Sequence, residues 1–170
     1  MNTHFLEKFR PHICAQSLYD VDLQDLKSKG IRCILLDMDN TLLPWKGIHI
    51  PQSTRDWVET ATDMGFKLCI VSNTHSPRRL KTVGEELGIK TVCKAVKPRR
   101  RGFHSAMRML NSTAEQCVVI GDQMLTDVFG GRRSGMLTIL VKPMHPHEFI
   151  GTKISRLVER AISSALHRKE

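Results

Sequence analysis

The chain has 170 residues, of which 41% are hydrophobic and 25% are charged, the ordinary mixture for a globular domain with one hydrophobic core. Its formal net charge of +9 favours anionic partners, such as nucleic acid, acidic membranes or phosphorylated substrates. The five cysteines include no C-x-x-C pair, which argues against a disulfide framework. No apolar run has the length of an N-terminal signal peptide or a membrane span, so we expect a cytoplasmic location.

Short apolar runs alternate with helical patterns along the whole chain. In chain order the patterns predict a strand at 31–36, a helix at 51–64, a strand at 68–71, a helix at 76–88, a strand at 89–96, a helix at 102–110, a strand at 117–120, a helix at 125–133, a strand at 136–141 and a helix at 152–167. Before the first strand, residues 1–30 form a basic amphipathic segment in which Phe5, Leu6 and Phe9 recur at helical spacing.

This alternation predicts one α/β domain over residues 1–170, a doubly wound parallel sheet of about five strands with helices on both faces. In such sheets ligands bind beyond the carboxyl ends of the strands. Polar residues follow four of the predicted strands, as Asp37 to Thr41, Ser72 to Thr74, Lys97, and Asp122 with Asp127. We therefore expect these side chains to meet at one edge of the sheet.

The residues at these strand ends match the needs of phosphate monoester hydrolysis. That reaction requires a nucleophile, a proton for the leaving alcohol and positive charge against the phosphoryl oxygens. Asp37 is the candidate nucleophile, which would form an aspartyl phosphate. Asp39 is the candidate acid, which would protonate the leaving oxygen and then activate water.

The same set predicts a magnesium site and a phosphate site. Mg²⁺ prefers oxygen ligands and commonly takes one or two carboxylates. We expect ligands from Asp37 and Asp122, the backbone carbonyl of Asp39, and Asp127 in a supporting position that holds a metal water or orients Lys97. The predicted phosphate contacts are Ser72, Asn73, Lys97 and Thr41.

Each of these residues also has a structural interpretation. Aspartates are common caps in strand-to-helix turns, and Asp127 alone fits the surface of a helix. Thr41 fits a residue that fixes the turn after Asp37 as well as it fits a phosphate contact. The functional interpretation therefore depends on the ordered set of residues.

In that order, the segment Asp37-Met38-Asp39-Asn40-Thr41, Ser72, Lys97 and Gly121-Asp122 through Asp127 resembles the four motifs of the haloacid-dehalogenase superfamily. The second aspartate, at position 39, is typical of its phosphatase branch. The longer match over Leu36–Leu42, Ser72-Asn73, Lys97-Pro98 and residues 121–131 is similar to the small YqeG-type phosphatases of subfamily IIIA. These phosphatases are related to the mitochondrial phosphatidylglycerophosphate phosphatase. Arg132 departs from the asparagine common there, and Arg99–Arg101 is unusually basic.

Phosphatases of this superfamily often carry a cap domain that selects the substrate. Here the two insertion positions are short, so we expect a capless site open to bulky substrates. Trp45 and Ile48 in the first of these loops fit either a flap over the site or packing at the domain edge.

Three hypotheses for function remain open at this point. The first is a phosphatase of phosphatidylglycerophosphate or a similar anionic lipid, with peripheral contact at the inner face of the membrane through its basic termini. The second is a phosphatase of a soluble or macromolecular phosphomonoester. The third is a basic RNA- or ribosome-binding protein with vestigial catalysis, which the scarcity of aromatic residues (5%) disfavours.

Overall fold

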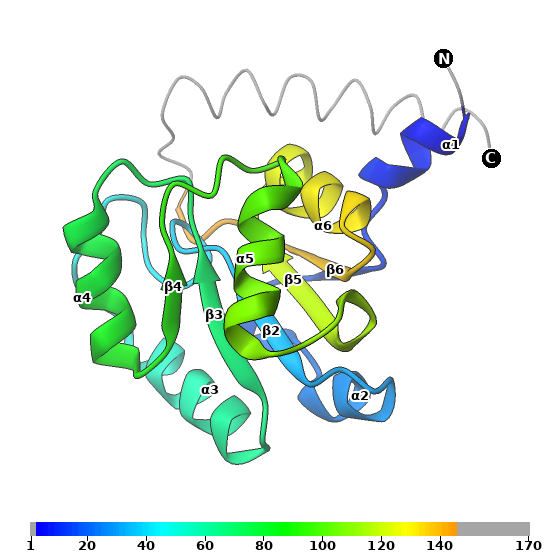
Figure 1. The fold of residues 1–170 in the computed structure, drawn as a ribbon. Coiled ribbons are helices and arrows are strands. Elements are labelled where there is room, and N and C mark those ends of the chain that lie inside the picture. Colours follow the sequence, from blue (N-terminus) through cyan, green and yellow to red (C-terminus); the bar gives the residue numbers. More distant parts are fainter. Residues whose placement is uncertain (1–2, 146–170) are drawn as a thin grey trace.

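The computed structural model describes residues 3–145, which form a parallel β-sheet between two layers of helices (Figure 1). Within these residues the sheet has six strands in the order β1-β6-β5-β2-β3-β4, and each recorded pairing is parallel. The strands are β1 (Ile13–Ala15), β2 (Cys33–Leu36), β3 (Lys67–Val71), β4 (Lys90–Val92), β5 (Cys117–Gly121) and β6 (Leu137–Val141). The predicted doubly wound parallel sheet is confirmed.

Helices connect the strands and cover both faces of the sheet (Figure 1). The α-helices are α1 (Thr3–Leu6), α2 (Leu23–Ser28), α3 (Gln52–Asp63), α4 (Pro77–Leu87), α5 (Arg100–Leu110) and α6 (Phe129–Arg133), with a π-helical turn at Met124–Val128 before α6. The helix α4 has a clear signal at each end. The side chain of Ser76 accepts a hydrogen bond from the N–H of Arg79 at the start of α4, and Gly88 ends α4 with a φ of 68°.

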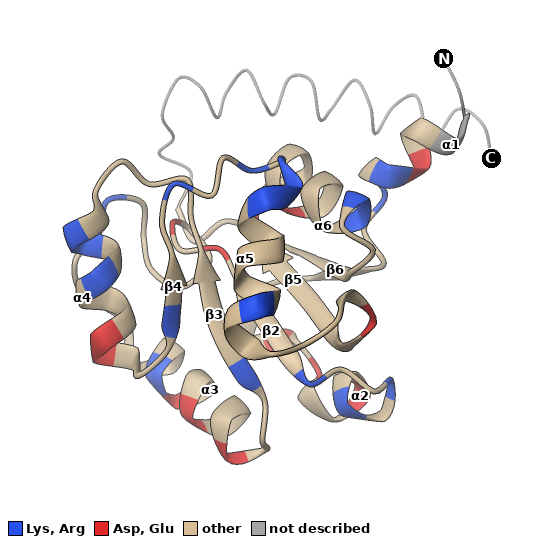
Figure 2. Cartoon of the chain, in the orientation of Figure 1, with Lys and Arg blue, Asp and Glu red and all other residues tan. Residues whose placement is uncertain are grey.

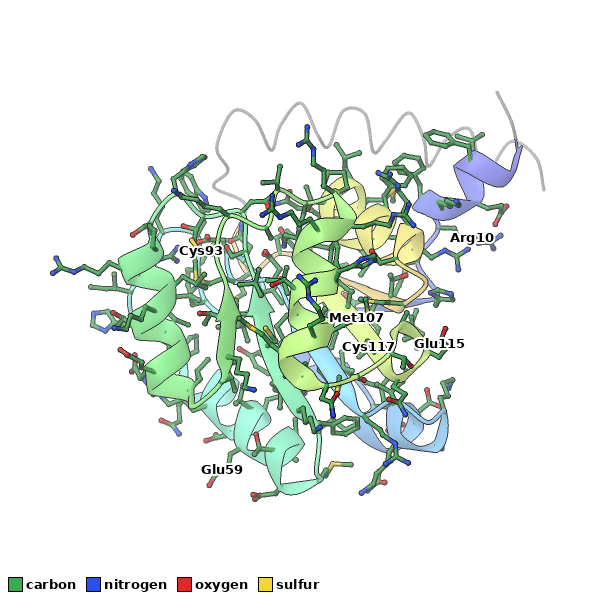
Figure 3. The ribbon with its side chains drawn as sticks, in the orientation of Figure 1. Arg10, Glu59, Cys93, Met107, Glu115 and Cys117 are labelled. Carbon is green, nitrogen blue, oxygen red and sulfur yellow. The ribbon has the colours of Figure 1, made fainter. Side chains whose placement is uncertain are left out.

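Alternate residues of the central strands face opposite layers of the core. Ile34 and Leu36 of β2 belong to one buried cluster, together with residues of α2, α3 and α4. Cys33 and Leu35 belong to the other, which includes the buried face of α5. Figure 3 shows Met107 and Cys117 between α5 and the sheet, where both join this second cluster. The sheet is therefore covered on both faces, which explains its continuous apolar strands.

The chain reverses its direction of winding between β2 and β5. From β2 it proceeds outward through β3 to β4, and from β5 it proceeds the other way to β6. This reversal creates a topological switch point, at which open α/β sheets commonly bind ligands. Asp37 directly follows β2 and Asp122 directly follows β5, so two of the predicted site residues flank the switch point.

The structure differs from the sequence prediction at both outer strands. The strand β1 was missed: only three residues pair with β6 at the edge of the sheet, too few to produce a clear alternating pattern. The strand predicted at 89–96 ends at Val92, because Lys94 and Val96 have positive φ values of 49° and 54°, which are incompatible with a strand. Lys97 therefore follows a loop and does not stand at a strand end.

The N-terminal segment packs on the domain through a cluster of aromatic rings. The rings of Phe9 and Phe129 are stacked with centroids 4.1 Å apart, and Phe5 meets both rings edge-on. Leu6 and Phe9 are buried. The helix predicted at 152–167 lies outside the described residues.

Both insertion positions for a cap are occupied by short connections. Residues 37–51 join β2 to α3, and only α4 and β4 lie between Val71 and the loop that carries Lys97. Within residues 3–145 the fold is therefore capless, as predicted. The helices in this part of the chain are too short or too polar to cross a membrane.

Candidate active site

The backbone places Asp37 and Asp122 side by side at the carboxyl edge of the sheet. The strands β2 and β5 are paired in register up to Leu36 and Ile120, and the N–H of Asp37 continues the ladder with a 2.9 Å hydrogen bond to the carbonyl of Ile120. Asp37 and Asp122 are 8% and 6% exposed. Because the ladder fixes both backbones, the two carboxylates are held on neighbouring strands.

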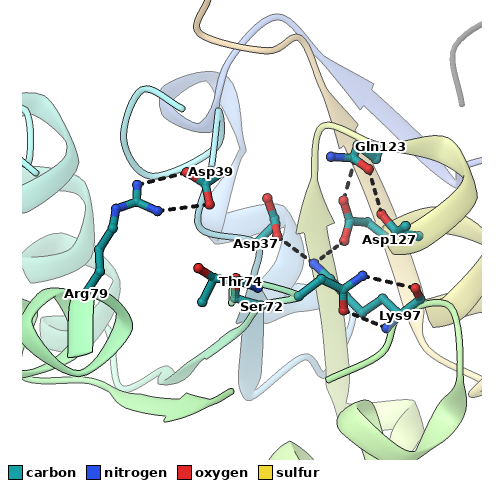
Figure 4. A network of polar contacts seen from close by, with 10 residues as sticks. Asp37, Asp39, Ser72, Thr74, Arg79, Lys97, Gln123 and Asp127 are labelled. Carbon is teal, nitrogen blue, oxygen red and sulfur yellow. Dashed lines mark hydrogen bonds and ion pairs between the residues drawn. The ribbon is translucent and has the colours of Figure 1, made fainter. Parts of the chain in front are cut away.

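Lys97 joins two carboxylates that are distant in the sequence (Figure 4). Its Nζ lies 2.6 Å from Oδ1 of Asp37 and 2.6 Å from Oδ1 of Asp127. All three side chains are at most 9% exposed. In such a buried setting each charge requires a partner, because an unpaired ion would lose its hydration without compensation.

The side chain of Asn73 fixes the backbone that carries Lys97. Its Oδ1 accepts a 2.7 Å hydrogen bond from the N–H of Lys97, and its Nδ2 donates to the carbonyl of the same residue at 3.0 Å. The sequence predicted Asn73 as a phosphate contact. In the structure Asn73 makes this bidentate contact with the loop of Lys97. It also lines a cavity that opens in front of Asp37.

Asp127 reaches the site from the π-helical turn, a local conformation that is often found at functional sites. Its Oδ2 accepts a hydrogen bond from the N–H of Gln123 at 3.2 Å while Oδ1 binds Lys97. Gly121 allows this approach, since a Cβ on Gly121 would lie only 2.7 Å from Cβ of Asp127.

The three buried aspartates at this edge suit a divalent cation. Asp37, Asp122 and Asp127 each offer one carboxylate oxygen, and these oxygens all lie within 4.8 Å of one another. Clustered oxygen donors of this kind are typical for Mg²⁺. The donor set therefore fits a divalent metal ion such as Mg²⁺.

Charge and burial shift the titration of this cluster. Burial raises the pKa of Asp37, and although Lys97 acts in the opposite direction, the repulsion from Asp127 and Asp39 adds to the rise and brings the pKa to about 7. Burial opposes the charged form of Lys97, but the attraction of Asp127 and Asp37 is stronger and raises the lysine's pKa. Lys97 is thus a permanent cation at the site.

Ser72 and Thr41, both predicted as phosphate contacts, have different surroundings. Ser72 lines the cavity beside Asp37, and its Oγ accepts a 3.1 Å hydrogen bond from the N–H of Thr74, which leaves the hydroxyl hydrogen available to donate. Thr41 is 1% exposed and lines a separate, neighbouring hollow. The structure thus brings Ser72, but not Thr41, to the wall of the cavity.

Asp39 points away from the three-aspartate cluster and forms an ion pair with Arg79 (Figure 4). Nη1 of Arg79 donates to Oδ2 of Asp39 at 3.1 Å, and Nη2 donates to Oδ1 at 2.8 Å. The N–H of Lys46 donates to Oδ1 at 3.0 Å. The side chain predicted as the acid is therefore held on the opposite wall.

A cavity of about 680 Å³ opens in front of Asp37, within the size range of pockets that hold whole ligands. Its lining consists of Asp37, Asp39, Asn40, Trp45, Lys46, Ser72, Asn73, Thr74, His75, Ser76, Arg79 and Gln123. Sequence reasoning missed Lys46, His75, Arg79 and Gln123. Arg79 lies three residues after the N-cap Ser76, in the helix that follows the Ser72 motif, but no local signal separates it from its neighbour Arg78.

Two protein-family models match adjoining parts of the chain. The model described as haloacid dehalogenase-like hydrolase matches residues 34–96, and the model described as HAD-hydrolase-like matches residues 95–143. Together they span the segments that carry Asp37, Ser72, Lys97 and Asp122. The class defined by the fold and the site is a phosphatase of the haloacid-dehalogenase type.

Proteins of similar sequence define a family within this class. The chain is 40% identical over 161 residues to Probable phosphatase YqeG of Bacillus subtilis (strain 168), covering 95% of this chain and 93% of that protein. The chain therefore belongs to the YqeG family within the haloacid-dehalogenase superfamily. It is also 27% identical to Phosphatidylglycerophosphate phosphatase 1, chloroplastic/mitochondrial, of Arabidopsis thaliana, over 86% of this chain but 45% of that protein.

Solved structures share the fold at low sequence identity. An uncharacterized protein from Listeria monocytogenes serotype 4b superposes with a TM-score of 0.57 at 19% identity, over 70% of this chain and 85% of that one. The cobalt-bound deoxy-D-mannose-octulosonate 8-phosphate phosphatase of Haemophilus influenzae gives a TM-score of 0.52 at 21% identity, over 68% and 70% of the chains. These likenesses support the parallel sheet and its helical layers.

Proposed function

We propose that the chain is a Mg²⁺-dependent phosphomonoesterase that works through an aspartyl phosphate on Asp37, with an anionic lipid phosphomonoester such as phosphatidylglycerophosphate as its substrate. The observation that carries the chemistry is the contact between Asp37 and Lys97, 2.6 Å long and buried beside two further aspartates. The lipid substrate is supported by the two phosphatidylglycerophosphate phosphatases among the relatives, at 27% and 29% identity.

In the first half of the reaction, a carboxylate oxygen of Asp37 attacks phosphorus and the ester bond to the leaving alcohol breaks. Lys97 balances the negative charge on Asp37 and on the phosphoryl group, and the hydroxyl of Ser72 donates to a phosphoryl oxygen. Asp39 turns from Arg79, takes up a proton from water once it has left the guanidinium, and gives that proton to the alcohol. The carboxylates of Asp37 and Asp122 and the carbonyl of Asp39 would hold Mg²⁺, which would supply further positive charge against the phosphoryl oxygens.

In the second half, water replaces Asp37 at phosphorus. Asp39 now accepts a proton from the attacking water, so that phosphate leaves and Asp37 is restored as a carboxylate. Asp127 keeps Lys97 in place in both halves through its 2.6 Å contact. Asp39 thus acts first as the acid and then as the base, after it has moved from Arg79 toward the reacting phosphate.

Peripheral membrane contact is part of the lipid hypothesis. Arg99, Arg100 and Arg101 are exposed at the N-terminal end of α5 (Figure 2), directly after the loop of Lys97. Exposed arginines at the edge that carries the site favour approach to an anionic headgroup layer. A soluble phosphomonoester is the second candidate, supported by the open cavity in a fold without a cap.

A phosphate-release screen tests this proposal. The protein is assayed with Mg²⁺ or EDTA on micellar phosphatidylglycerophosphate, sugar phosphates, nucleotides and an aryl phosphate, with Asp37→Asn as the control. We expect metal-dependent release that Asp37→Asn abolishes, and much faster release from the lipid. Equal rates on lipid and soluble esters would contradict the lipid substrate, and full activity of Asp37→Asn would contradict the mechanism.

A further inference from the structure

Arg79 is the side chain that most clearly lacks a role in the chemistry at Asp37. It reaches from the first turn of α4 to the cavity wall, and its side chain is 15% exposed. Beyond its two bonds to Asp39, its Nε donates to the carbonyl of Gly47 at 2.8 Å. The carbonyl of Gly47 therefore fixes the orientation of the guanidinium. The carboxylate of Asp39 occupies the edge formed by Nη1 and Nη2.

The cavity wall carries basic side chains as well as carboxylates. Asp37, which belongs to the aspartate cluster, and the basic residues Lys46 and Arg79 all line it. The Nζ of Lys46 lies 4.5 Å from the ring centroid of Trp45, another lining residue. A cavity of about 680 Å³ is also larger than one phosphoryl group requires, so a second group of the substrate has space within it.

We infer that Arg79 binds a second anionic group of the substrate, and that this group replaces the carboxylate of Asp39 on the guanidinium. The enzyme then selects phosphomonoesters that carry a second phosphate or carboxylate a short distance from the ester. This inference rests on the proposed function, because it assigns the cleaved phosphate to Asp37. A second anionic group near the cleaved ester is a feature that lipid and soluble substrates can share.

The exchange follows from the geometry of the ion pair. A guanidinium presents a planar fork that binds carboxylate and phosphate oxygens in the same two-point manner. Asp39 occupies that fork in the structure, and in this position it faces away from Asp37 (Figure 4). A substrate anion on the fork releases Asp39 to turn toward the reacting phosphate, so recognition of the second anion and assembly of the site become one event.

The alternative role for Arg79 is that of a positioning residue that only orients Asp39. The two roles predict different kinetics. Loss of a purely positioning residue slows the reaction of every phosphomonoester to a similar degree. Loss of a substrate contact instead weakens the binding and turnover of those substrates that carry the second anion.

Matched substrates separate these roles. Glycerol 1-phosphate and glycerol 1,3-bisphosphate form the soluble pair, and short-chain phosphatidic acid and phosphatidylglycerophosphate form the lipid pair. The enzymes are wild type, Arg79→Met, Arg79→Lys and the control Arg78→Met, which changes an exposed neighbour outside the cavity. Thermal melting of each variant establishes that it is folded.

We expect wild type to prefer the member with two phosphates in each pair by about 10- to 100-fold in kcat/KM, the range for a charged hydrogen-bonded contact. Arg79→Met should remove this preference mainly by raising KM, Arg79→Lys should restore part of it, and Arg78→Met should keep it. Preference in the lipid pair alone would identify the lipid as the source of the second anion. Equal losses on both members of each pair, or no preference in wild type, would overturn the inference.

A binding measurement separates failure of this inference from failure of the proposed function. In EDTA, calorimetric titration compares the affinities of the two glycerol phosphates for wild type and Arg79→Met. Tighter binding of the bisphosphate that depends on Arg79 supports the inference even if no substrate is hydrolysed. Hydrolysis that depends on Asp37 without any such difference in affinity or kcat/KM retains the phosphatase and overturns the role of Arg79.

Discussion

The ammonium group of Lys97 lies 2.6 Å from a carboxylate oxygen of Asp37, across 60 positions of the sequence. Within residues 3–145, the ion pairs of these two side chains are this contact and the contact of Lys97 with Asp127. In the proposed mechanism the pair links stability and catalysis, since the cation that balances Asp37 would also face the transferring phosphoryl group.

Replacing Lys97 with methionine should impair both properties. Removal of one partner from a buried ion pair leaves an uncompensated charge, so we expect the free energy of unfolding to fall by about 3–5 kcal/mol. The kcat should fall by about 10²- to 10³-fold, as for other groups that stabilise charge in a transition state. Urea denaturation and phosphate release measure the two effects.

Lys94→Met is the matched control, because Lys94 is an exposed lysine of the same loop, and it should change neither quantity. The double variant Lys97→Met/Asp127→Asn should regain part of the lost stability, because it removes one of the unbalanced charges. A Lys97→Met protein as stable as wild type would show that the pair does not balance buried charge.

The raised pKa of Asp37 predicts a pH-dependent stability in the metal-free protein. Folding raises this pKa from 3.8 to about 7, so the folded state binds the proton more tightly than the unfolded state between these values. The stabilisation is complete below pH 3.8 and is lost as pH rises through 7. We expect the free energy of unfolding in EDTA to fall on the order of 2 kcal/mol from about pH 5 to about pH 8.

Asp37→Asn is the control for this pH dependence, because it removes the titrating group. Urea denaturation at several pH values should give a smaller fall for this variant than for wild type. Mg²⁺ should stabilise wild type more at high pH than at low pH, since it binds the ionised carboxylates. The same fall in both proteins would assign the titration to another group.

The close approach of Asp127 to Gly121 predicts a selective effect of a single methyl group. Gly121→Ala would place a Cβ 2.7 Å from Cβ of Asp127, so Asp127 must shift and carry Lys97 with it. We expect a loss of about 1–3 kcal/mol in stability, as for other overpacked sites, and a fall in kcat. Enzyme assays and thermal unfolding measure both.

Gly30→Ala provides the contrast at a distant glycine. Gly30 has a φ of 79° and open space around it, so alanine there should cost about 1–2 kcal/mol through backbone strain without changing kcat. Similar kcat values for Gly121→Ala and Gly30→Ala would contradict the account of Asp127.

The bidentate contact of Asn73 predicts a kinetic effect on Lys97. Asn73→Ala frees both the N–H and the carbonyl of Lys97, and the loss of such hydrogen bonds costs about 1–3 kcal/mol. We expect kcat to fall by about tenfold with a smaller change in KM, because the lysine acts mainly in the transition state. Steady-state kinetics on an aryl phosphate measure this; a change confined to KM would favour a direct contact with the substrate.

The sequence was sufficient for the parts of the site that depend on local patterns. Asp37 and Asp122 follow continuous apolar runs, and parallel strands necessarily bring such positions to one edge of a sheet. The strand β1 escaped prediction because its three residues gain their order from pairing with β6. The turn before Lys97, where Lys94 and Val96 have positive φ, escaped as well, since its contacts with Ser72 and Asn73 are distant in the sequence and no local pattern records them.

The contact between Arg79 and Asp39 could not be predicted from the sequence either. Arg79 lies in an ordinary basic stretch, Arg78-Arg79, at the start of a helix, and nothing local distinguishes the two arginines. Their difference is the direction in which the helix presents them: Arg79 faces the loop after Asp37, and Arg78 faces solvent. Packing of α4 against the first cluster of the core decides this orientation.

The most direct test of the central claim is to locate the covalent phosphate. The protein is mixed with Mg²⁺ and substrate, quenched in acid during turnover, and treated with borohydride, which reduces an acyl phosphate and converts the phosphorylated aspartate to homoserine. Peptide mass spectrometry should place the change at Asp37 and nowhere else, and Asp37→Asn should show none. Turnover at full rate with no modified residue, or with the change at another aspartate, would contradict the mechanism.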